Sequence, residues 1–166
     1  MYVVIGYGNA LRRDDGAGLI LAQEIADVLK NKGKDVVHIS AHQLDPELVY
    51  AFVGAEGVIF VDAGVYVGDP MVRVVPIGAK PLSHTVGHQM APEMLLLLAN
   101  ALLNTAFPAW LVRVPGWDFE FGEGIGTKTQ HALDQFRQTL VQDWHTLFSV
   151  APQAESDATV QNDSGV

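Results

Sequence analysis

The sequence has no cysteine among its 166 residues. This absence excludes disulfide bonds, thiolate metal sites and a cysteine nucleophile. It is typical of proteins from a reducing compartment, and we therefore expect a cytoplasmic protein. The start of the chain also lacks a basic segment followed by an apolar segment and a small-residue cleavage site, so we expect no secretion signal.

Basic residues are few as well. Ten lysines and arginines stand against nineteen aspartates and glutamates, and the formal net charge is −9 at pH 7. Such a surface repels nucleic acids and anionic membranes, so we expect neither as a partner. No apolar run is long enough to cross a bilayer, because the longest, residues 94–99, stops at Asn100 and is typical of a buried helix.

Apolar residues, in contrast, are plentiful, at 49% of the chain. That share and the length predict one globular domain with a substantial core, which we place at residues 1–150. Residues 151–166 are rich in glutamine, alanine, serine and aspartate, and this composition predicts a disordered tail. We see no internal repeat or second domain in the sequence, and we expect a monomer.

Apolar β-branched segments alternate along the chain with segments of helical periodicity. Strands are expected at residues 3–5, 36–39, 57–62, 71–75 and 110–114, and helices at 17–30, 46–53, 91–103 and 127–147. Only about ten residues join the third and fourth strands, too few for a crossover helix, so the fourth is expected to be antiparallel. The order predicts an α/β fold, a three-layer α/β/α sandwich with a mostly parallel sheet of about five strands.

The strongest local pattern is Gly6-Tyr7-Gly8-Asn9 after the first strand, followed by Asp14-Asp15-Gly16. The glycines permit a turn and a close approach of the backbone. One aspartate can cap the next helix, because its carboxylate accepts the free N–H groups of the first turn. The second is more than a cap needs and indicates chemistry, although a purely structural turn is the alternative. A dinucleotide fingerprint would need a third glycine where Leu11 stands, and a phosphate loop would end in Gly-Lys-Ser/Thr.

Two further polar residues are expected at the same edge of the sheet. Asp62 ends the strongest apolar strand, and residues past the carboxyl ends of parallel strands line the ligand crevice. His88 directly precedes a helix. Together with Asp15 they form a donor set that suits nickel or zinc, the alternatives being a metal-free acid–base pair and, for Asp62, a simple turn carboxylate. His42, after the second strand, is expected near this edge, and His84 can at most support a ligand.

Three motifs in this order resemble the hydrogenase maturation endopeptidases. They are the opening run at residues 6–18, Val61-Asp62-Ala63-Gly64 and Gly87-His88-Gln89-Met90, and the resemblance extends over residues 2–148. In that family, residues at the positions of Asp15, Asp62 and His88 bind a metal. The resemblance implies an endopeptidase that removes the C-terminal extension of a [NiFe] hydrogenase large-subunit precursor.

The resemblance also implies that cleavage follows nickel insertion. Nickel is then supplied by the substrate, and no permanently bound cofactor is expected. The same three residues are expected to be catalytic as well as metal-binding. The attacking group is either a nickel-polarised water or a water activated by one of the carboxylates. We assign substrate binding to Gly8, Asn9, His42 and Gln89.

The chain departs from the family pattern in two places. Residues 40–43 read Ser-Ala-His-Gln where many members carry an acidic turn, and Gly126-Thr127 replaces a Leu-Ser before the last helix, keeping only a hydroxyl cap. The run from His42 to Leu48 resembles the branch that serves bidirectional, NAD-linked hydrogenases. Two other functions stay open: a metal-dependent chaperone of the same precursor, and a peptidyl-tRNA hydrolase. The latter would need a basic surface and a Pro-Gly where Ala10-Leu11 stands.

Overall fold

The computed structural model describes residues 1–81 and 90–149. The strands within these residues are β1 (Tyr2–Tyr7), β2 (Val36–Ala41), β3 (Gly57–Val65), β4 (Arg73–Ile77) and β5 (Ala109–Gly116). The α-helices are α1 (Ala17–Asn31), α2 (Pro92–Leu103) and α3 (Thr127–Leu147), and two 3₁₀ helices are η1 (Arg13–Gly16) and η2 (Pro46–Phe52). The predicted tail at residues 151–166, like His84, His88 and Gln89, lies outside the described residues.

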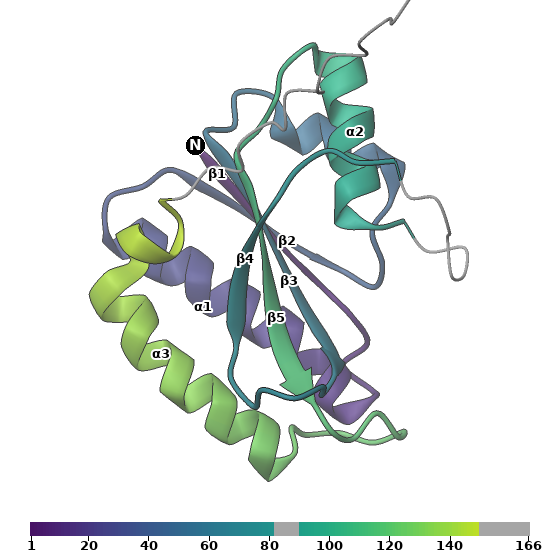
Figure 1. The fold of residues 1–166 in the computed structure, drawn as a ribbon, viewed down its shortest axis with the longest axis vertical. Helices are drawn as coiled ribbons and strands as arrows, with labels where there is room; N and C mark the ends of the chain where they lie inside the picture. Colours follow the sequence, from purple (N-terminus) through teal and green to yellow (C-terminus); the bar gives the residue numbers. More distant parts are fainter. Residues whose placement is uncertain (82–89, 150–166) are drawn as a thin grey trace, which may run out of the picture.

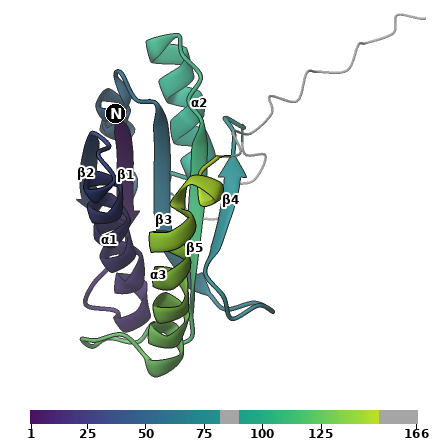
Figure 2. The same cartoon turned by 90° about the vertical axis from the view of Figure 1, so that its left-hand side faces the viewer.

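The strands form one sheet in the order β2-β1-β3-β5-β4, which runs from left to right in Figure 2. All neighbouring pairs are parallel except β4 and β5, which are antiparallel. The prediction of a mostly parallel sheet with one antiparallel strand is confirmed. Strand β4 is antiparallel because the connection from β3 to β4 is too short to cross the sheet, as the sequence predicted.

Helices cover both faces of the sheet and complete the three-layer α/β/α sandwich. Helices α1 and α3 lie along one face, and α2 packs with η2 on the other (Figure 1). Because both faces are covered, the central strands are apolar on both sides: Val4 and Ile59 contact the α1–α3 layer, and Val3 and Phe60 contact the α2–η2 layer. No helix within residues 1–81 and 90–149 is long and apolar enough to span a membrane.

Two glycines seat α1 against the middle of the sheet. A Cβ on Gly6 would lie 2.6 Å from the Cβ of Ala22, and a Cβ on Gly18 would lie 3.0 Å from the carbonyl oxygen of Val61 and 3.1 Å from the Cα of Asp62. Larger residues would therefore push the helix away from β1 and β3. The close packing holds the start of α1, and the acidic turn before it, directly beside Asp62.

The order of the strands determines where a ligand crevice forms. From β1 the chain continues to β2 on one side, and β3 then returns to the other side of β1. In open α/β sheets, ligands bind beyond the carboxyl ends of the strands at such a reversal. The loop after β1 and the end of β3 meet at this point, so the topology brings the predicted acidic residues to one place.

Candidate functional site

The loop after β1 folds back on η1 and holds Asp15. Gly8 begins this loop with a φ of +144°, and a Cβ there would lie only 2.3 Å from the carbonyl oxygen of Asp15. Only glycine tolerates both conditions. The N–H of Asn9 then donates to Oδ2 of Asp15 at 2.8 Å, and the side chain of Asn9 accepts from the N–H of Leu11 at 2.9 Å. The loop thus orients one oxygen of Asp15 and leaves Oδ1 without a hydrogen bond from the described residues.

Asp62 lies within β3, so the prediction that the strand ends there is wrong. The strand continues to Val65 because β5 pairs with it as far as Gly116. The neighbour on the other side, β1, is already at its end, since its last pairing with β3 joins Gly6 to Val61. The side chain of Asp62 therefore borders the crevice although its backbone is part of the sheet.

The surroundings of Asp62 change its acidity. Burial raises its pKa to about 6, and the negative charge of Asp15 adds to this effect. The N–H of Ala63, the charge of Arg113 and the hydroxyl of Tyr7 act in the opposite direction and are outweighed. Burial and the charge of Asp62 likewise raise the pKa of Tyr7 above its ordinary value. A carboxyl group with a pKa of about 6 can exchange a proton near neutral pH.

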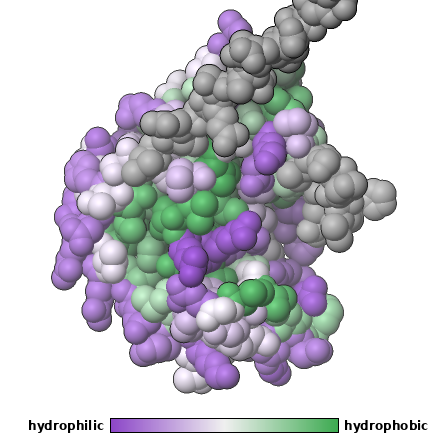
Figure 3. Space-filling view, viewed as in Figure 1, coloured by the Kyte–Doolittle hydropathy of each residue, from purple (hydrophilic) through white to green (hydrophobic). Residues whose placement is uncertain are grey.

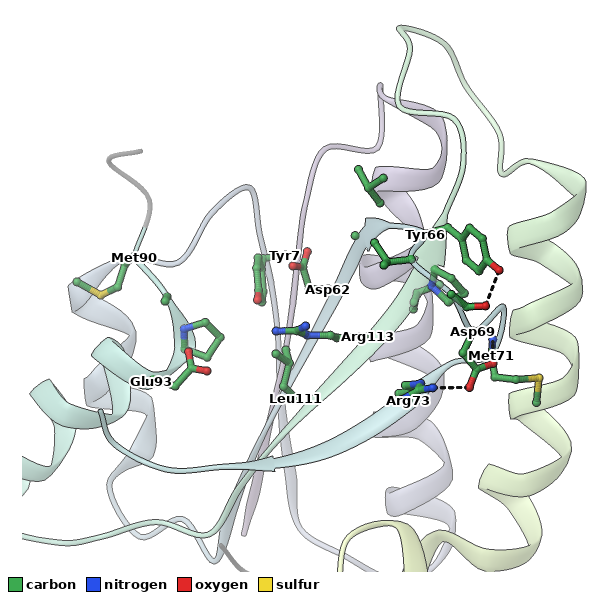
Figure 4. A pocket seen from close by; sticks show the side chains of 18 residues that line it. Tyr7, Asp62, Tyr66, Asp69, Met71, Arg73, Met90, Glu93, Leu111 and Arg113 are labelled. Atoms are coloured by element: carbon green, nitrogen blue, oxygen red, sulfur yellow. Dashed lines mark hydrogen bonds and ion pairs between the residues drawn. The ribbon is translucent and has the colours of Figure 1, made fainter. Parts of the chain in front are cut away.

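Asp62 stands at the junction of two hollows. The smaller has a volume of about 270 Å³ and is lined by Tyr7, Gly8, Asn9, Arg12, Asp15, His42, Gln43, Leu44, Asp62, Ala63 and Met90. The larger is a groove of about 750 Å³ that continues from Asp62 toward β4 and the start of α2 (Figure 4). Tyr7, Asp62 and Met90 line both. A ligand that extends from one hollow into the other therefore passes beside Asp62.

The smaller hollow brings together five of the seven site residues predicted from the sequence. These are Gly8, Asn9, Asp15, His42 and Asp62. The remaining two, His88 and Gln89, lie outside the described residues. Within residues 1–81 and 90–149, no group of three or more histidine, aspartate or glutamate side chains is arranged to hold a metal ion. Two carboxylates are present at the crevice, and a third ligand at His88 stays a prediction.

Asp14 has a role that the sequence did not predict. Its side chain is only 1% exposed and accepts hydrogen bonds from parts of the chain more than 100 residues away. The donors are the N–H groups of Trp117 (2.9 Å), Asp118 (3.0 Å) and Gly126 (2.7 Å) and the hydroxyl of Thr129 (2.8 Å). Burial alone would raise its pKa, but these hydrogen bonds outweigh burial and hold the pKa of Asp14 below its ordinary value.

The helix caps predicted at the aspartate pair and at Thr127 are therefore wrong. Helix α1 begins at Ala17, and Gly16 stands in the cap position with no side-chain cap, since Asp14 turns to the β5–α3 connection and Asp15 to the loop after β1. Helix α3 also begins without a side-chain cap, so the hydroxyl of Thr127 does not serve as one. In contrast, η2 has a side-chain cap, because the carboxylate of Asp45 accepts the N–H of Glu47 at its start.

The structure adds two residues to the site, Tyr7 and Arg113. Arg113 lies directly opposite Asp62 in the pairing of β3 with β5, and its charge acts on both Asp62 and Tyr7. A signal was present in the sequence, because Arg113 is the one charged residue in the otherwise apolar strand at residues 110–114. Tyr7 stands inside the glycine motif itself.

A third hollow lies away from these residues. Apolar side chains gather over β4 and α3 (Figure 3), around a groove of about 330 Å³ lined by Met71, Val72, Val74, Pro76, Trp110, Gln135, Phe136, Thr139, Thr146 and Leu147. This lining contains no carboxylate or imidazole. It therefore offers no group for acid–base chemistry or metal binding, and the crevice at Asp62 is the candidate site.

Comparison with known proteins gives the fold a clear match. No family model and no curated protein matches the sequence. Among solved structures, the [NiFe] hydrogenase maturation protease HycI from Thermococcus kodakarensis KOD1 has a TM-score of 0.65 at 16% identity, with 90% of this chain and 92% of that chain covered. The chain has the fold of a hydrogenase maturation protease.

Two further structures agree with this match. The endopeptidase HycI from Escherichia coli has a TM-score of 0.58 at 17% identity, over 95% of this chain and 99% of that chain. The maturation protease HybD from Thermococcus kodakarensis has a TM-score of 0.55 at 18% identity, over 85% and 97%. The fold class predicted from the sequence is confirmed, and the likeness at these identities concerns the fold alone.

Proposed function

We propose that this chain is an endopeptidase that removes the C-terminal extension from the precursor of a [NiFe] hydrogenase large subunit. The observation that carries the proposal is the meeting of Asp15 and Asp62 in one hollow, at the reversal point of a sheet with the fold of maturation proteases. Two carboxylates at such a crevice are suited to metal recognition and to proton transfer.

In this proposal, nickel belongs to the substrate. Asp15 and Asp62 bind the nickel that the precursor already carries, and His88 is the third ligand. Oδ1 of Asp15 has no hydrogen-bond donor among the described residues, which suits a ligand oxygen. Nickel recognition then allows cleavage only after the metal has been inserted.

Cleavage itself needs a proton acceptor close to the scissile bond. A water oxygen attacks the carbonyl carbon, the bond from carbon to nitrogen breaks, and the proton of the water goes to the leaving amine. Asp62, which lies beside Asp15 in the same hollow, is the carboxylate that accepts this proton and passes it on. Gly8 and Asn9 hold Asp15 in place, and they contact the precursor together with His42 and Gln89.

The finer assignments are part of the same proposal. The partner is the precursor of a bidirectional, NAD-linked hydrogenase, on the basis of the run that begins at His42. The protein acts as a monomer in the cytoplasm. The acidic net charge of −9 supports a protein partner over nucleic acid.

The test is a cleavage assay on two forms of the precursor. The purified protein is mixed with nickel-loaded and with nickel-free large-subunit precursor, and the mass of the precursor is followed. We expect a C-terminal loss only in the nickel-loaded sample. Tight binding of the loaded form without any loss of mass would instead identify a metal-dependent chaperone, and neither binding nor cleavage would refute the proposal.

A further inference from the structure

The larger groove extends away from Asp62, and the metal recognition proposed above uses none of its other lining residues. Its volume of about 750 Å³ is in the range of specific ligand sites, and residues from β1, β3, β5 and the start of α2 line it. Apolar side chains, among them Met71, Met90 and Leu111, form parts of its wall. A mixed wall of this kind suits a peptide chain with neutral side chains.

Arg113 is the basic group in this groove that makes no hydrogen bond or ion pair with the described residues. Figure 4 shows its side chain beside Tyr7 and Asp62, with Glu93 nearby and Arg73 turned toward Asp69. Arg73 donates to Asp69 at 2.7 Å, whereas Arg113 forms no ion pair or hydrogen bond within residues 1–81 and 90–149. A guanidinium group with free N–H donors beside the candidate site is available to a ligand.

The charge around Arg113 argues against an acidic ligand. Three acidic residues (Asp62, Asp69 and Glu93) and two arginines line the groove, so its net charge is negative when all are ionised. A carboxylate on the ligand would be repelled by this surplus. A main-chain carbonyl oxygen is neutral and accepts a hydrogen bond from the guanidinium group without that cost.

We infer that the groove binds the precursor segment next to the scissile bond, with Arg113 donating a hydrogen bond to a main-chain carbonyl oxygen of that segment. This inference rests on the proposed function, and it adds a peptide site to the metal-recognition site. Because Tyr7 and Asp62 line both hollows, a chain seated in the groove continues past Asp62 toward Asp15. The bound segment is held before the reaction begins.

The test measures peptide binding without nickel. A synthetic peptide that spans the processing site of the precursor is titrated calorimetrically into the wild-type protein and into Arg113→Met. We expect the Kd to rise about ten-fold or more in Arg113→Met, because a charge-assisted hydrogen bond is lost. Arg113→Lys should lie between the two, and Lys32→Met, which removes an exposed charge at the far end of α1, should bind like the wild type.

Two controls identify the atom that Arg113 binds and the way it acts. A peptide whose acidic side chains are replaced by their amides should show the same weakening with Arg113→Met. Arg113→Met should also weaken peptide binding when it is combined with Asp62→Asn and compared with Asp62→Asn alone. If Arg113→Met no longer raises the Kd of the amide peptide, Arg113 binds a side-chain carboxylate of the ligand. If it no longer raises the Kd in the Asp62→Asn protein, Arg113 acts through Asp62. Either result overturns the inference.

Other outcomes separate this inference from the proposed function. An unchanged Kd in Arg113→Met, or no binding of the peptide to the wild-type protein, overturns the peptide site while cleavage of the nickel-loaded precursor still supports the endopeptidase. If Arg113→Met lowers kcat for the precursor and leaves KM unchanged, Arg113 contacts the substrate only in the transition state. That result would overturn the inference that Arg113 binds the peptide before the reaction. Peptide binding without cleavage would refute the endopeptidase alone.

Discussion

Asp14 and Asp62 are both aspartates near one edge of the sheet, but their surroundings act on them in opposite ways. Asp14 is surrounded by donors: three N–H groups and a hydroxyl hold its pKa low. Asp62 is buried among too few donors and beside a second carboxylate, and its pKa rises to about 6. The comparison shows that burial alone does not define a functional carboxylate, because the supply of donors decides whether it stabilises the fold or is available for chemistry.

The largest effect is expected on activity, from Asp62→Asn. The substitution keeps the shape but removes the charge and the proton acceptor, so cleavage of nickel-loaded precursor should fall by about two to four orders of magnitude. Precursor mass against time measures this, and circular dichroism should show an intact fold. Asp143→Asn, at an exposed position of α3, is the matched control. Wild-type rates in Asp62→Asn would remove Asp62 from the site.

The next effect is expected on stability, from Asp14→Ala. Loss of the carboxylate leaves buried N–H groups without acceptors, so the free energy of unfolding should fall by about 3 kcal/mol. Urea denaturation measures this. Asp118→Ala is the control on a nearby residue, because it breaks the more exposed ion pair with Arg13 and should lower the free energy of unfolding much less than Asp14→Ala does. Equal losses of unfolding free energy in the two variants would contradict the conclusion that the hydrogen bonds of Asp14 to the β5–α3 connection stabilise the fold.

A third effect concerns the loop that holds Asp15. In Gly8→Ala, the new methyl group would meet the carbonyl oxygen of Asp15, and the backbone would keep an unfavourable positive φ. We expect a loss of about 2 kcal/mol in the free energy of unfolding together with a loss of cleavage. Gly78→Ala is the control, since nothing lies within 4 Å of its added Cβ, and it should change neither. If Gly8→Ala is as stable and as active as the wild type, the loop accommodates the methyl group and glycine is not required at this position.

The smallest effect is a pH dependence with opposite signs at the two aspartates. The folded-state pKa of Asp62, about 6, lies above its unfolded value, so ionisation destabilises the fold as the pH rises from about 4 through 6. Asp62→Asn should therefore be more stable than the wild type by about 1 kcal/mol at pH 7.5, and this gain should shrink toward pH 4.

Asp14 should show the reverse. Its folded-state pKa is lowered, so its contribution to stability is present above the ordinary pKa of aspartate and is lost as the pH falls through the folded-state value. The advantage of the wild type over Asp14→Asn should therefore stay constant from pH 7 to 5 and narrow below about pH 4. Thermal unfolding of Asp62→Asn, Asp14→Asn and the wild type across this pH range measures how each stability difference changes with pH. The same direction of change for both variants would contradict the contrast between Asp14 and Asp62.

Much of the fold was predictable because it depends on local patterns. The apolar runs around Val4 and Ile59 predicted strands covered on both faces, and the short connection after β3 predicted the antiparallel β4. The spacing of strand ends also placed Asp15 and Asp62 at one edge. The boundaries were less predictable, since β3 continues past Asp62 only because β5 offers a partner there.

The sequence by itself determined the alternation of strands and helices, the glycine turn and the acidic pair after it, because these depend on residues close together in the chain. Only the tertiary structure decided how the acidic residues divide their roles. The donors that hold Asp14 come from residues more than 100 positions away, and Arg113 comes beside Asp62 only when β5 pairs with β3. The acidity of a carboxyl group is set by what surrounds it in space, and no local pattern contains that information.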